Sequence, residues 1–406
     1  MKTTPTPVRY LLGGVFINQM GAFVQTFLVL YLTVRGLSLG QAGAALTVYS
    51  AGAVLGTLLG GELTHRLGAR TTIAVAMSAS ALIVGSVPFL SDSDRFGFLL
   101  AAVLLGGLAT QSYRPAAAVL LSDLMPDEHR LMAFSMMRIA MNIGAAVGPL
   151  IAAGLILLDW DWLFWFDAIT AGAYALLAIV WLPKTPPHAQ ESEPTSDSRS
   201  VYATMLRDGR FLLFLLSMLI SAAIYVQYVV ALPLKITSEN HPAALYSVAL
   251  ATSSVILILC ELKVTTYVRH WPPNVASALG NLVMGAGLAV FGLSTDSAAL
   301  ILIGIVVFVS GIMIGGPSSF AHPARYPAAV KARYVGAAQA MFGLGSALGP
   351  VLGVLAWDKL GNGIWLLCGI IGAIAALCAL VGMNVRFEPE PAPEPAPEDV
   401  SARDVG

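Results

Sequence analysis

Two arginines lie within long apolar stretches of the sequence, apart from any other charge. They are Arg114 and Arg138. An arginine at the centre of a membrane-spanning helix costs about 2.5–3.5 kcal/mol on insertion scales, so it should face a wet cavity or a partner. Gln111 shares a helix face with Arg114, and Asn142 shares one with Arg138. These polar stripes predict the lining of a cavity, and a structural ion pair at each arginine is the alternative.

Acidic residues are scarce in the same apolar stretches. Glu261 lies toward one end of such a stretch, and Asp167 lies near the end of another. Coupling to a proton gradient needs a titratable group that both sides of the membrane can reach. Glu261 is therefore the first candidate for proton coupling, and Asp167 is the second. Alternatively, Glu261 anchors a helix end by pairing with Lys263 or Arg269.

Further polar and aromatic side chains are suited to an amphipathic pocket. Tyr225 and Tyr228 fall on one stripe near residues 211–236, and Asn18 and Gln25 share a helix face. Tyrosines also populate interfaces between helices, which is the alternative for this stripe. The complete set predicted to line the cavity is Asn18, Gln25, Tyr49, Gln111, Arg114, Arg138, Asn142, Tyr225, Gln227, Tyr228 and Phe342.

The elements that hold these residues are predicted to be membrane-spanning helices. The 406 residues are 57% hydrophobic and 11% charged, whereas soluble domains carry about 25% charged residues. The apolar blocks exceed the roughly 18 residues that span a bilayer. We expect an all-α membrane protein with twelve transmembrane helices in two six-helix bundles. The predicted spans lie near residues 9–35, 40–65, 70–90, 96–123, 131–158, 162–182, 211–236, 243–268, 274–294, 298–322, 331–357 and 363–385.

The basic residues predict how these spans are oriented. Placing both termini in the cytoplasm puts fifteen of the 22 Lys and Arg residues in cytoplasmic segments and four outside. Such an asymmetry follows the positive-inside rule. The first apolar run extends from Tyr10 to Val34, too long for the core of a signal peptide. The sequence thus predicts a multi-pass protein of the cell (inner) membrane that retains its first span.

Composition also divides the chain into segments. Residues 184–210 are rich in Pro, Ser and charge, which is typical of a cytoplasmic linker. Residues 387–406 form a Pro/Glu-rich tail that we expect to be disordered. Residues 1–183 and 211–386 are then the N-terminal and C-terminal six-helix bundles.

The two predicted bundles repeat one another. The series Pro126, Arg130, Gly144, Gly148, Pro149 recurs 201 residues later as Pro327, Lys331, Gly345, Gly349, Pro350. Parallel repeats of this kind place a binding site at their interface, near the bilayer midplane.

Several other functions find no support in the sequence. The net charge of −1 offers no basic footprint for nucleic acid. The three cysteines lie inside apolar blocks without the spacing of metal ligands. The sequence contains no P-loop, zincin motif, nucleophile elbow or Rossmann fingerprint. We therefore expect no metal site, no cofactor, no enzymatic activity and no ATP-driven transport.

The sequence resembles the major facilitator superfamily, and within it the twelve-helix drug:proton antiporter group. Residues 61–70 are similar to the family's cytoplasmic Gly-x-x-x-Asp-Arg-x-Gly-Arg-Arg motif, with His65 where Asp is usual. Residues 144–149 are similar to the Gly-x-x-x-Gly-Pro core of the antiporter group, and residues 126–130 fit its loop between the fourth and fifth spans. The resemblance implies a transporter that acts on small molecules and protons in a lipid bilayer, and we expect a monomer.

The resemblance also implies a cytoplasmic latch between the two halves. Gly61 and Gly68 would permit a tight turn, and His65 would make the latch sensitive to pH because its ordinary pKa is about 6.5. Positive-inside topology alone is the alternative for the basic residues of this loop. The predicted latch residues are Gly61, His65, Arg66, Gly68, Arg70 and Asp123.

Glycines and prolines in the fifth and eleventh spans predict a pair of hinges. A Gly-x-x-x-Gly step lets another helix approach closely, and a proline removes a backbone donor and kinks its helix. Packing without any gating role is the alternative. The predicted hinge residues are Gly144, Gly148, Pro149, Gly345, Gly349 and Pro350.

Three functional hypotheses follow. The leading one is a secondary active transporter that exports small lipophilic compounds by alternating access in exchange for protons, as the resemblance at residues 144–149 implies. The second is a proton-coupled or facilitative transporter of a polar or anionic metabolite, favoured by Arg114 and Arg138. The third is a non-transporting membrane sensor or assembly scaffold, although a scaffold need not bear the cost of midplane arginines.

Overall fold

The computed structural model describes residues 4–91, 93–184, 198–242, 244–293 and 297–385. The described residues are almost entirely helical. The α-helices are α1 (Thr6–Met20), α2 (Val24–Val34), α3 (Leu39–Leu67), α4 (Ala69–Ser86), α5 (Phe96–Leu124), α6 (Asp127–Ile156), α7 (Trp162–Trp181), α8 (Ser198–Arg207), α9 (Gly209–Tyr225), α10 (Gln227–Ser238), α11 (Ala244–Val268), α12 (Pro273–Leu293), α13 (Ala298–Ala321), α14 (Ala328–Leu360) and α15 (Gly363–Gly382). Three short 3₁₀ helices, η1 (Val87–Leu90), η2 (Ser93–Arg95) and η4 (His322–Arg325), extend or join them.

Within this described part of the chain, twelve helices or helix pairs are long and apolar enough to cross a membrane. This number confirms the sequence prediction, and most boundaries agree within a few residues. The fifth and eleventh spans begin earlier than predicted, at Asp127 and Ala328, because Pro126 and Pro327 serve as their N-caps. A proline suits a helix start, where its missing N–H would have had no partner. The predicted disordered tail, 387–406, lies outside the described residues.

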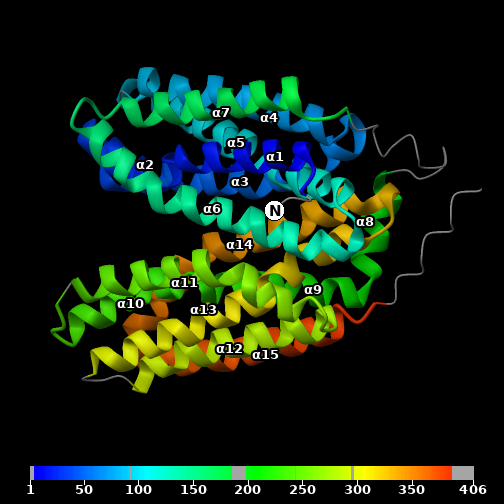
Figure 1. Cartoon of the computed structure of the whole chain (residues 1–406). Helices are drawn as coiled ribbons and strands as arrows, with labels where there is room; N and C mark the ends of the chain where they lie inside the picture. The colour runs from blue at the N-terminus through cyan, green and yellow to red at the C-terminus, as the bar shows by residue number, and fades with distance from the viewer. Residues whose placement is uncertain (1–3, 92, 185–197, 243, 294–296, 386–406) are drawn as a thin grey trace, which may run out of the picture.

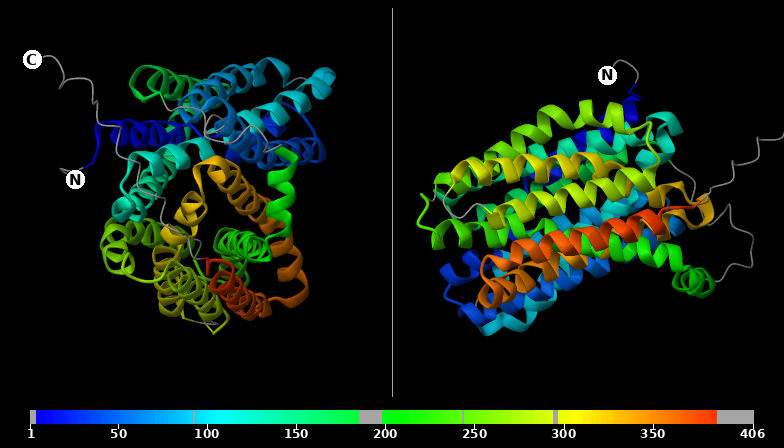
Figure 2. Two further views of the ribbon diagram at one scale, coloured as in Figure 1. Left: turned by 90° about the vertical axis from the view of Figure 1, so that its right-hand side faces the viewer. Right: turned by 90° about the horizontal axis from the view of Figure 1, so that it is seen from below.

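The twelve spans form two bundles with the same internal arrangement. In Figure 1 the first half (blue to green, α1–α7) lies above the second half (green to red, α9–α15), and the left-hand view of Figure 2 shows the same division from the linker side. Helices α6 and α14 start 201 residues apart, as the sequence repeat predicts. The linker contributes the short helix α8 at one end of the molecule (Figure 1). We call this the linker end, and the end that carries α2 and α10 the far end.

The first span of each half is broken rather than continuous, which the sequence prediction missed. The break between α1 and α2 falls at residues 21–23, and α9 gives way to α10 at Val226. The side chain of Asp167 accepts a hydrogen bond of 3.3 Å from the backbone N–H of Phe23 at the first break. Buried backbone donors need such a partner, so the carboxylate stabilises the interruption.

Glycines on α3 allow α5 to approach it closely along a long stretch. A Cβ at Gly52, Gly56 or Gly60 would overlap the carbonyl oxygens of Leu104, Leu108 or Ser112 on α5. The spacing of four residues keeps these glycines on one helix face. The hydroxyl of Ser112 donates a 2.9 Å hydrogen bond to the carbonyl of Gly56, which fixes the register of the two helices. This close contact positions α5, the helix that carries Arg114.

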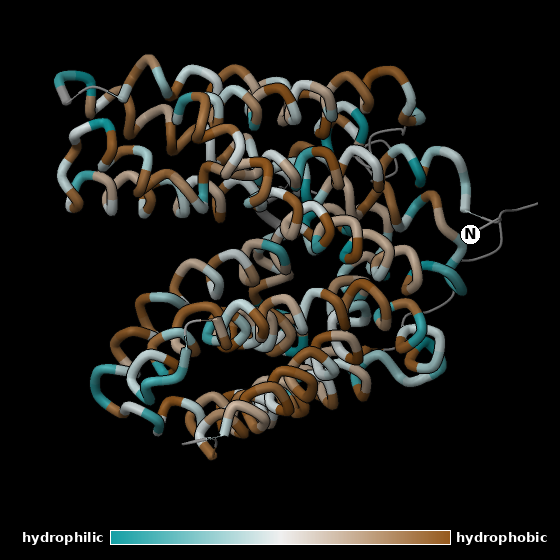
Figure 3. The backbone as a smooth tube through the Cα atoms, turned by 60° about the vertical axis from the view of Figure 1, so that its left-hand side comes forward, coloured by the Kyte–Doolittle hydropathy of each residue, from teal (hydrophilic) through white to brown (hydrophobic). Residues whose placement is uncertain are grey.

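The two halves contact each other mainly through four helix pairs. These are α3 with α14, α5 with α14, α6 with α11, and α6 with α13. Helices α2 and α10 pack mainly on neighbours in their own halves, and the two halves diverge toward the far end in Figure 3. The halves are therefore held together most closely at the linker end.

Candidate substrate cavity

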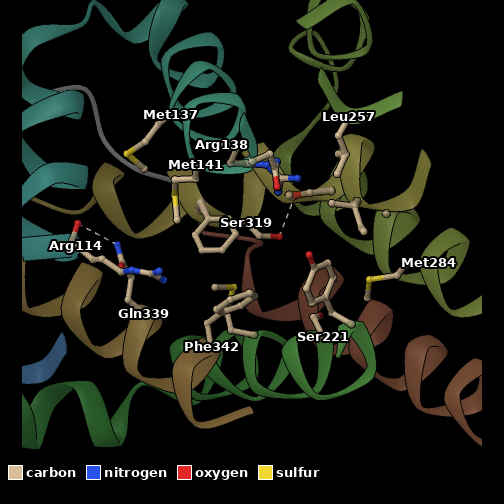
Figure 4. A pocket seen from close by; sticks show the side chains of 18 of the residues that line it. Arg114, Met137, Arg138, Met141, Ser221, Leu257, Met284, Ser319, Gln339 and Phe342 are labelled. Atoms are coloured by element: carbon tan, nitrogen blue, oxygen red, sulfur yellow. Dashed lines mark hydrogen bonds between the residues drawn. The ribbon is translucent and has the colours of Figure 1, made fainter. Parts of the chain in front are cut away.

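A cavity of about 300 Å³ lies between the two halves. Its walls come from α1, α5 and α6 of the first half and from α9, α11, α12, α13 and α14 of the second. The lining is mainly apolar, with several flexible methionines and aromatic rings. Figure 4 shows Arg114, Arg138 and Phe342 on different sides of this space. The methionine and aromatic residues among its lining are Tyr113, Met137, Met141, Met218, Tyr225, Met284, Phe320 and Phe342.

A buried ion pair crosses from one half to the other in the cavity wall. The Nε of Arg138 on α6 lies 2.7 Å from the Oε1 of Glu261 on α11. The side chain of Glu261 is fully buried, whereas that of Arg138 is 13% exposed and lines the cavity. A Cβ at Gly316 of α13 would overlap the Arg138 guanidinium, so this glycine leaves room for it. Arg138 thus separates Glu261 from the cavity.

A hydrogen bond continues this polar contact between the same two helices. The hydroxyls of Ser135 on α6 and Thr265 on α11 lie 2.8 Å apart. Ser135 lies one helical turn from Arg138, and Thr265 lies one turn from Glu261. Both are on the side of the ion pair nearer the linker end. Thr265 also donates to the backbone carbonyl of Glu261 at 2.8 Å. The α6–α11 contact is therefore a continuous polar seam, which neither Lys263 nor Arg269 joins in the described structure.

A second cavity, of about 100 Å³, lies within the first half. Its walls come from α1, α2, α3, α5 and the break at Ala22. Tyr113 and Arg114 line both cavities, so the two spaces meet at this point of α5. In contrast to the large cavity, its lining is mainly polar. The polar residues are Asn18, Gln19, Gln25, Thr26, Tyr49, Thr110, Gln111, Tyr113 and Arg114.

Arg114 stands in this polar environment without a counter-charge. Among the described residues, it forms no ion pair, and its Nε is buried without a hydrogen-bond partner. Its backbone carbonyl accepts a 3.4 Å hydrogen bond from the side-chain amide of Gln339 on α14 (Figure 4). The two arginines that the sequence singled out therefore differ, because Arg138 is neutralised and Arg114 is not.

The structure divides the predicted cavity residues into three groups. Arg138, Asn142, Tyr225 and Phe342 line the large cavity, and Arg114 lines both. Asn18, Gln25, Tyr49 and Gln111 line the small cavity. Gln227 and Tyr228 line neither. Gln227 donates 2.8 Å and 2.9 Å hydrogen bonds to the carbonyls of Ala223 and Gly349, and the ring of Tyr228 packs on Phe308.

Asp167, the second predicted coupling residue, lines neither cavity. Its side chain is buried at 2% exposure and lies at the break between α1 and α2. Residues that the sequence prediction did not name also line the large cavity, including Met137, Met141, Met218 and Met284. Methionine in an apolar helix gives no signal that distinguishes a cavity wall from a core position.

The linker end carries two ion pairs between the halves. The Nε of Arg333 on α14 lies 2.8 Å from Glu62 on α3, and Lys331 on α14 lies 2.9 Å from Asp123 on α5. Arg66 pairs with Glu62 at 2.6 Å along the same helix. Asp123, one of the predicted latch residues, pairs with Lys331 of the other half. Arg70 donates to the backbone carbonyl of Ile179.

The structure gives different roles to the two glycines that were predicted to form a tight turn. Gly68 does form the turn between α3 and α4, with a φ of +80° that favours glycine. Gly61 does not, because it lies within α3. A Cβ at Gly61 would lie 2.7 Å from the carbonyl of Ala332 and 3.1 Å from Gly336 on α14. Gly61 thus serves the close contact between the halves, and His65 is buried at 5% exposure one turn further along α3.

The helix α8 covers the same contact from the linker side. The hydroxyl of Tyr202 donates a 3.4 Å hydrogen bond to Glu62, and the Arg333 guanidinium lies 5.9 Å from its ring. Val201 and Met205 join a cluster that includes Phe211 and Tyr334. Burial, and next the negative charge of Glu62, raise the pKa of Tyr202 above its ordinary value. The phenol therefore stays protonated and can donate at neutral pH.

The predicted hinge residues lie in unbroken helices and pack within their own halves. A Cβ at Gly144 would lie 2.8 Å from the Cβ of Gln19 on α1, and one at Gly148 would lie 3.3 Å from the carbonyl of Met20. In the other half, Gly345 and Gly349 contact α9 in the same way. Pro149 and Pro350 follow directly within α6 and α14. These residues form equivalent close contacts, and a hinge motion remains a prediction.

Known proteins resemble the chain in sequence and in fold. The chain is 25% identical over 363 residues to the multidrug resistance protein MdtL of Escherichia coli O81 (strain ED1a), across 86% of this chain and 89% of that one. It is 23% identical over 405 residues to a Na(+), Li(+), K(+)/H(+) antiporter of Planococcus maritimus, across 91% and 93% of the two chains. The solved structure of a bacterial homologue of the iron transporter ferroportin, in its outward-facing state, matches with a TM-score of 0.74 at 14% identity over 93% of this chain and 98% of that one, which shows the fold alone.

A sequence model of a whole family gives the broader assignment. It covers most of the chain, including both cavities and both ion pairs of the linker end. Members of that family are transporters rather than enzymes. The model of the Major Facilitator Superfamily matches residues 11–350, and the chain therefore belongs to this superfamily of membrane transporters.

Proposed function

We propose that this transporter exports small, largely apolar compounds by alternating access, in exchange for protons. The observation that carries the proposal is the Arg138–Glu261 pair, which joins the two halves in the wall of a cavity between them. A carboxylate at this position can titrate and, at the same time, change how strongly the halves attract each other. Coupling of a proton to a conformational change requires both properties.

The proton acts on the ion pair in the following order. Arg138 shields Glu261 from the cavity, so a proton reaches the carboxylate when the arginine side chain swings into the open space. Protonation removes the negative charge and with it the attraction across the α6–α11 seam. Removing one charge of a buried pair typically costs about 3–5 kcal/mol, enough to shift a conformational equilibrium. The linker end can then open, and the proton leaves on that side.

The orientation of the chain gives this cycle its direction. From the basic residues and the positive-inside rule, we infer that the linker end faces the cytoplasm and that the chain works as a monomer in the cell (inner) membrane. The halves meet at that end in this conformation, through Glu62–Arg333 and Lys331–Asp123. Opening toward the cytoplasm must break both pairs. We infer that these pairs form the latch that closes the transporter on its cytoplasmic side.

The lining of the large cavity supports an apolar substrate. Methionine side chains are flexible and polarisable, and they adapt to ligands of different shapes. Aromatic rings such as Tyr225 and Phe342 add rigid apolar surface. One relative is named a multidrug resistance protein, which agrees with an apolar substrate. Another is named a cation/proton antiporter, which agrees with proton exchange alone.

Uptake or exchange of a polar or anionic metabolite is the second candidate function. The observation that favours it is the unpaired Arg114, a cation in the walls of both cavities. A membrane sensor or assembly scaffold is the third candidate. It would not require solute movement, and solute flux through the purified protein would exclude it.

The proposal is tested by proton movement in proteoliposomes that contain the purified protein and a pH-sensitive dye. Lipophilic compounds added to one side should trigger proton movement in the opposite direction, and Glu261→Gln should abolish it. Glu128→Gln is the matched control, because Glu128 is exposed in the first turn of α6. Solute flux without any proton movement would contradict antiport. Proton movement that survives in Glu261→Gln would remove Glu261 from the coupling step.

A further inference from the structure

The two cavities have opposite character and adjoin at Tyr113 and Arg114. The large cavity is mainly apolar, and the small one is mainly polar. Arg114 and Tyr113 belong to both linings. A ligand that spans this junction would place one part among methionines and rings, and another part among amides and hydroxyls. The shape of the site therefore suits an amphipathic molecule with a compact polar head.

The charges of the combined site favour one sign of head group. Within the described residues, neither lining contains Asp or Glu, and their charged members are Arg114 and Arg138. Glu261 neutralises Arg138 at 2.7 Å. Asp167, the other acid of this region, accepts the N–H of Phe23 at the helix break and lines neither cavity. The combined site consequently keeps one uncompensated positive charge, on Arg114.

Neutral donors surround this charge on the side of the small cavity. The side-chain amides of Asn18, Gln19 and Gln25 lie in its wall and make no hydrogen bond with the described part of the chain. Each can turn an N–H toward an acceptor. A guanidinium presents several N–H groups in a fixed plane that matches a carboxylate. The small cavity therefore offers donors in excess and a positive charge, which is the environment an anion requires.

We propose that Arg114 binds the carboxylate of an amphipathic organic anion, with the head group in the small cavity and the apolar body in the large one. The volumes agree with this arrangement. An apolar cavity of about 150 Å³ holds one benzene molecule, so the small cavity of about 100 Å³ suits a carboxylate head group better than a ring system. The large cavity, of about 300 Å³, takes the body. This inference rests on the proposed transport function and specifies the substrate class.

The test compares three probes that share one apolar body and differ in the head group. Naphthylacetate is an anion, naphthylacetamide is neutral, and naphthylethylamine is a cation at pH 7. Binding to the purified full-length protein is measured by equilibrium dialysis. Hydrogen bonds to charged groups contribute enough for the anion to bind about tenfold or more tightly than the amide. The amine should bind more weakly than the amide.

Variants of Arg114 connect this preference to the guanidinium. Arg114→Gln should remove the preference for naphthylacetate over naphthylacetamide, and Arg114→Lys should retain part of it because the charge remains. Arg95→Gln is the matched control, since Arg95 lies at the start of the same helix and outside both cavities. Retention of the full preference in Arg114→Gln would overturn the proposal, as would tighter binding of the amine than of the anion in the unaltered protein.

Transport of the same probes separates the head-group proposal from the proposed function. Counterflow in proteoliposomes that favours naphthylacetate, and loses this selectivity in Arg114→Gln, supports both. Equal flux of all three probes leaves the transport function standing and overturns the carboxylate site. Absence of binding and flux for all three, in a protein that size-exclusion chromatography shows to be folded and monodisperse, overturns the carboxylate site, and the transport function falls with it only if the other lipophilic compounds also give no flux.

Discussion

Two contacts between the halves occupy equivalent positions in the internal repeat, and their chemistry differs. In the α3–α14 contact, backbone meets backbone, because a Cβ at Gly61 would lie 3.1 Å from the Cα of Gly336. Gly336 follows Ser135 by the 201 residues of the repeat. In the equivalent α6–α11 contact, Ser135 bonds Thr265, and Arg138 pairs with Glu261. The two contacts therefore occupy equivalent places in the repeat and differ in the side chains that form them.

This difference in chemistry suggests that the two contacts have different roles in transport. Along its glycines, the α3–α14 contact consists of closely packed backbones. At its linker end it carries an ion pair, Glu62–Arg333. It is suited to closing the linker end tightly. The α6–α11 contact holds a charge pair that lies against the cavity. It is suited to responding to protons and ligands. We infer that the α3–α14 contact closes the linker end, and that protons and ligands acting on the α6–α11 contact control when that end opens.

Removal of the arginine from the polar contact should have the largest effect. Arg138→Ala leaves Glu261 buried without its partner, at a typical cost of about 3–5 kcal/mol. We expect solute counterflow in proteoliposomes to fall by about 100-fold or more. The comparison variant is Gln339→Ala, at the equivalent position of α14, for which we expect a loss below about tenfold. Equal losses of counterflow in both variants would contradict the proposed difference between the two contacts.

A bulky side chain in the glycine contact should push the halves apart. Gly336→Leu has no space between α3 and α14, and overpacking of this kind costs about 1–3 kcal/mol. We expect a population shift of about 5–150-fold toward the state that is open at the linker end. Spin labels at the exposed positions 128 and 269 would report it as a longer distance in pulsed electron resonance. Gly154→Leu is the matched control, because a Cβ at Gly154 meets open space.

Loss of the ion pair at the end of the glycine contact should have a smaller effect in the same direction. Glu62→Gln removes the charge that Arg333 and Arg66 share. The Glu62 side chain is 18% exposed, so water screens part of the loss, and we expect a shift of about fivefold. Asp94→Asn, in the loop at the far end, should leave the same spin-label distance unchanged. A distance distribution in Glu62→Gln identical to that of the unaltered protein would exclude a latching role.

The smallest effect is expected from the linker helix. Tyr202→Phe removes a single long hydrogen bond of 3.4 Å to Glu62 and keeps the ring near Arg333. We expect a shift below about threefold. Since burial raises the pKa of Tyr202 above its ordinary value, the phenol should stay protonated, and the shift should be the same at pH 6 and pH 9. A shift that disappears at pH 9 would indicate that the phenol ionises.

The spans and their number were predictable from the sequence, because an apolar block of sufficient length is a local signal. Broken helices were not predictable in the same way. The interruption at residues 21–23 depends on the carboxylate of Asp167, which lies 144 residues away from Phe23. Gly61 was misjudged for a related reason. Glycine signals turns and close helix contacts alike, and only the position of α14 decides between them.

The candidate site was predictable in its residue types and less so in its pairings. The cost of a midplane charge singled out Arg114 and Arg138, and both line the large cavity. The partner of Glu261 was sought nearby in the sequence, at Lys263 or Arg269. Its actual partner, Arg138, belongs to the other half. Such long-range pairings depend on how the two bundles dock, which residue spacing alone does not encode.

The central claim is that Glu261 links protonation to the contact between the halves. The most direct test is the distance between spin labels at positions 128 and 269, on the linker ends of α6 and α11, measured in nanodiscs from pH 8 to pH 5. We predict that acidification lengthens this distance in the unaltered protein. In Glu261→Gln the distance should be long at every pH, since the glutamine mimics the protonated acid. A distance that does not change with pH in the unaltered protein, or that responds to pH equally in Glu261→Gln, would contradict the account.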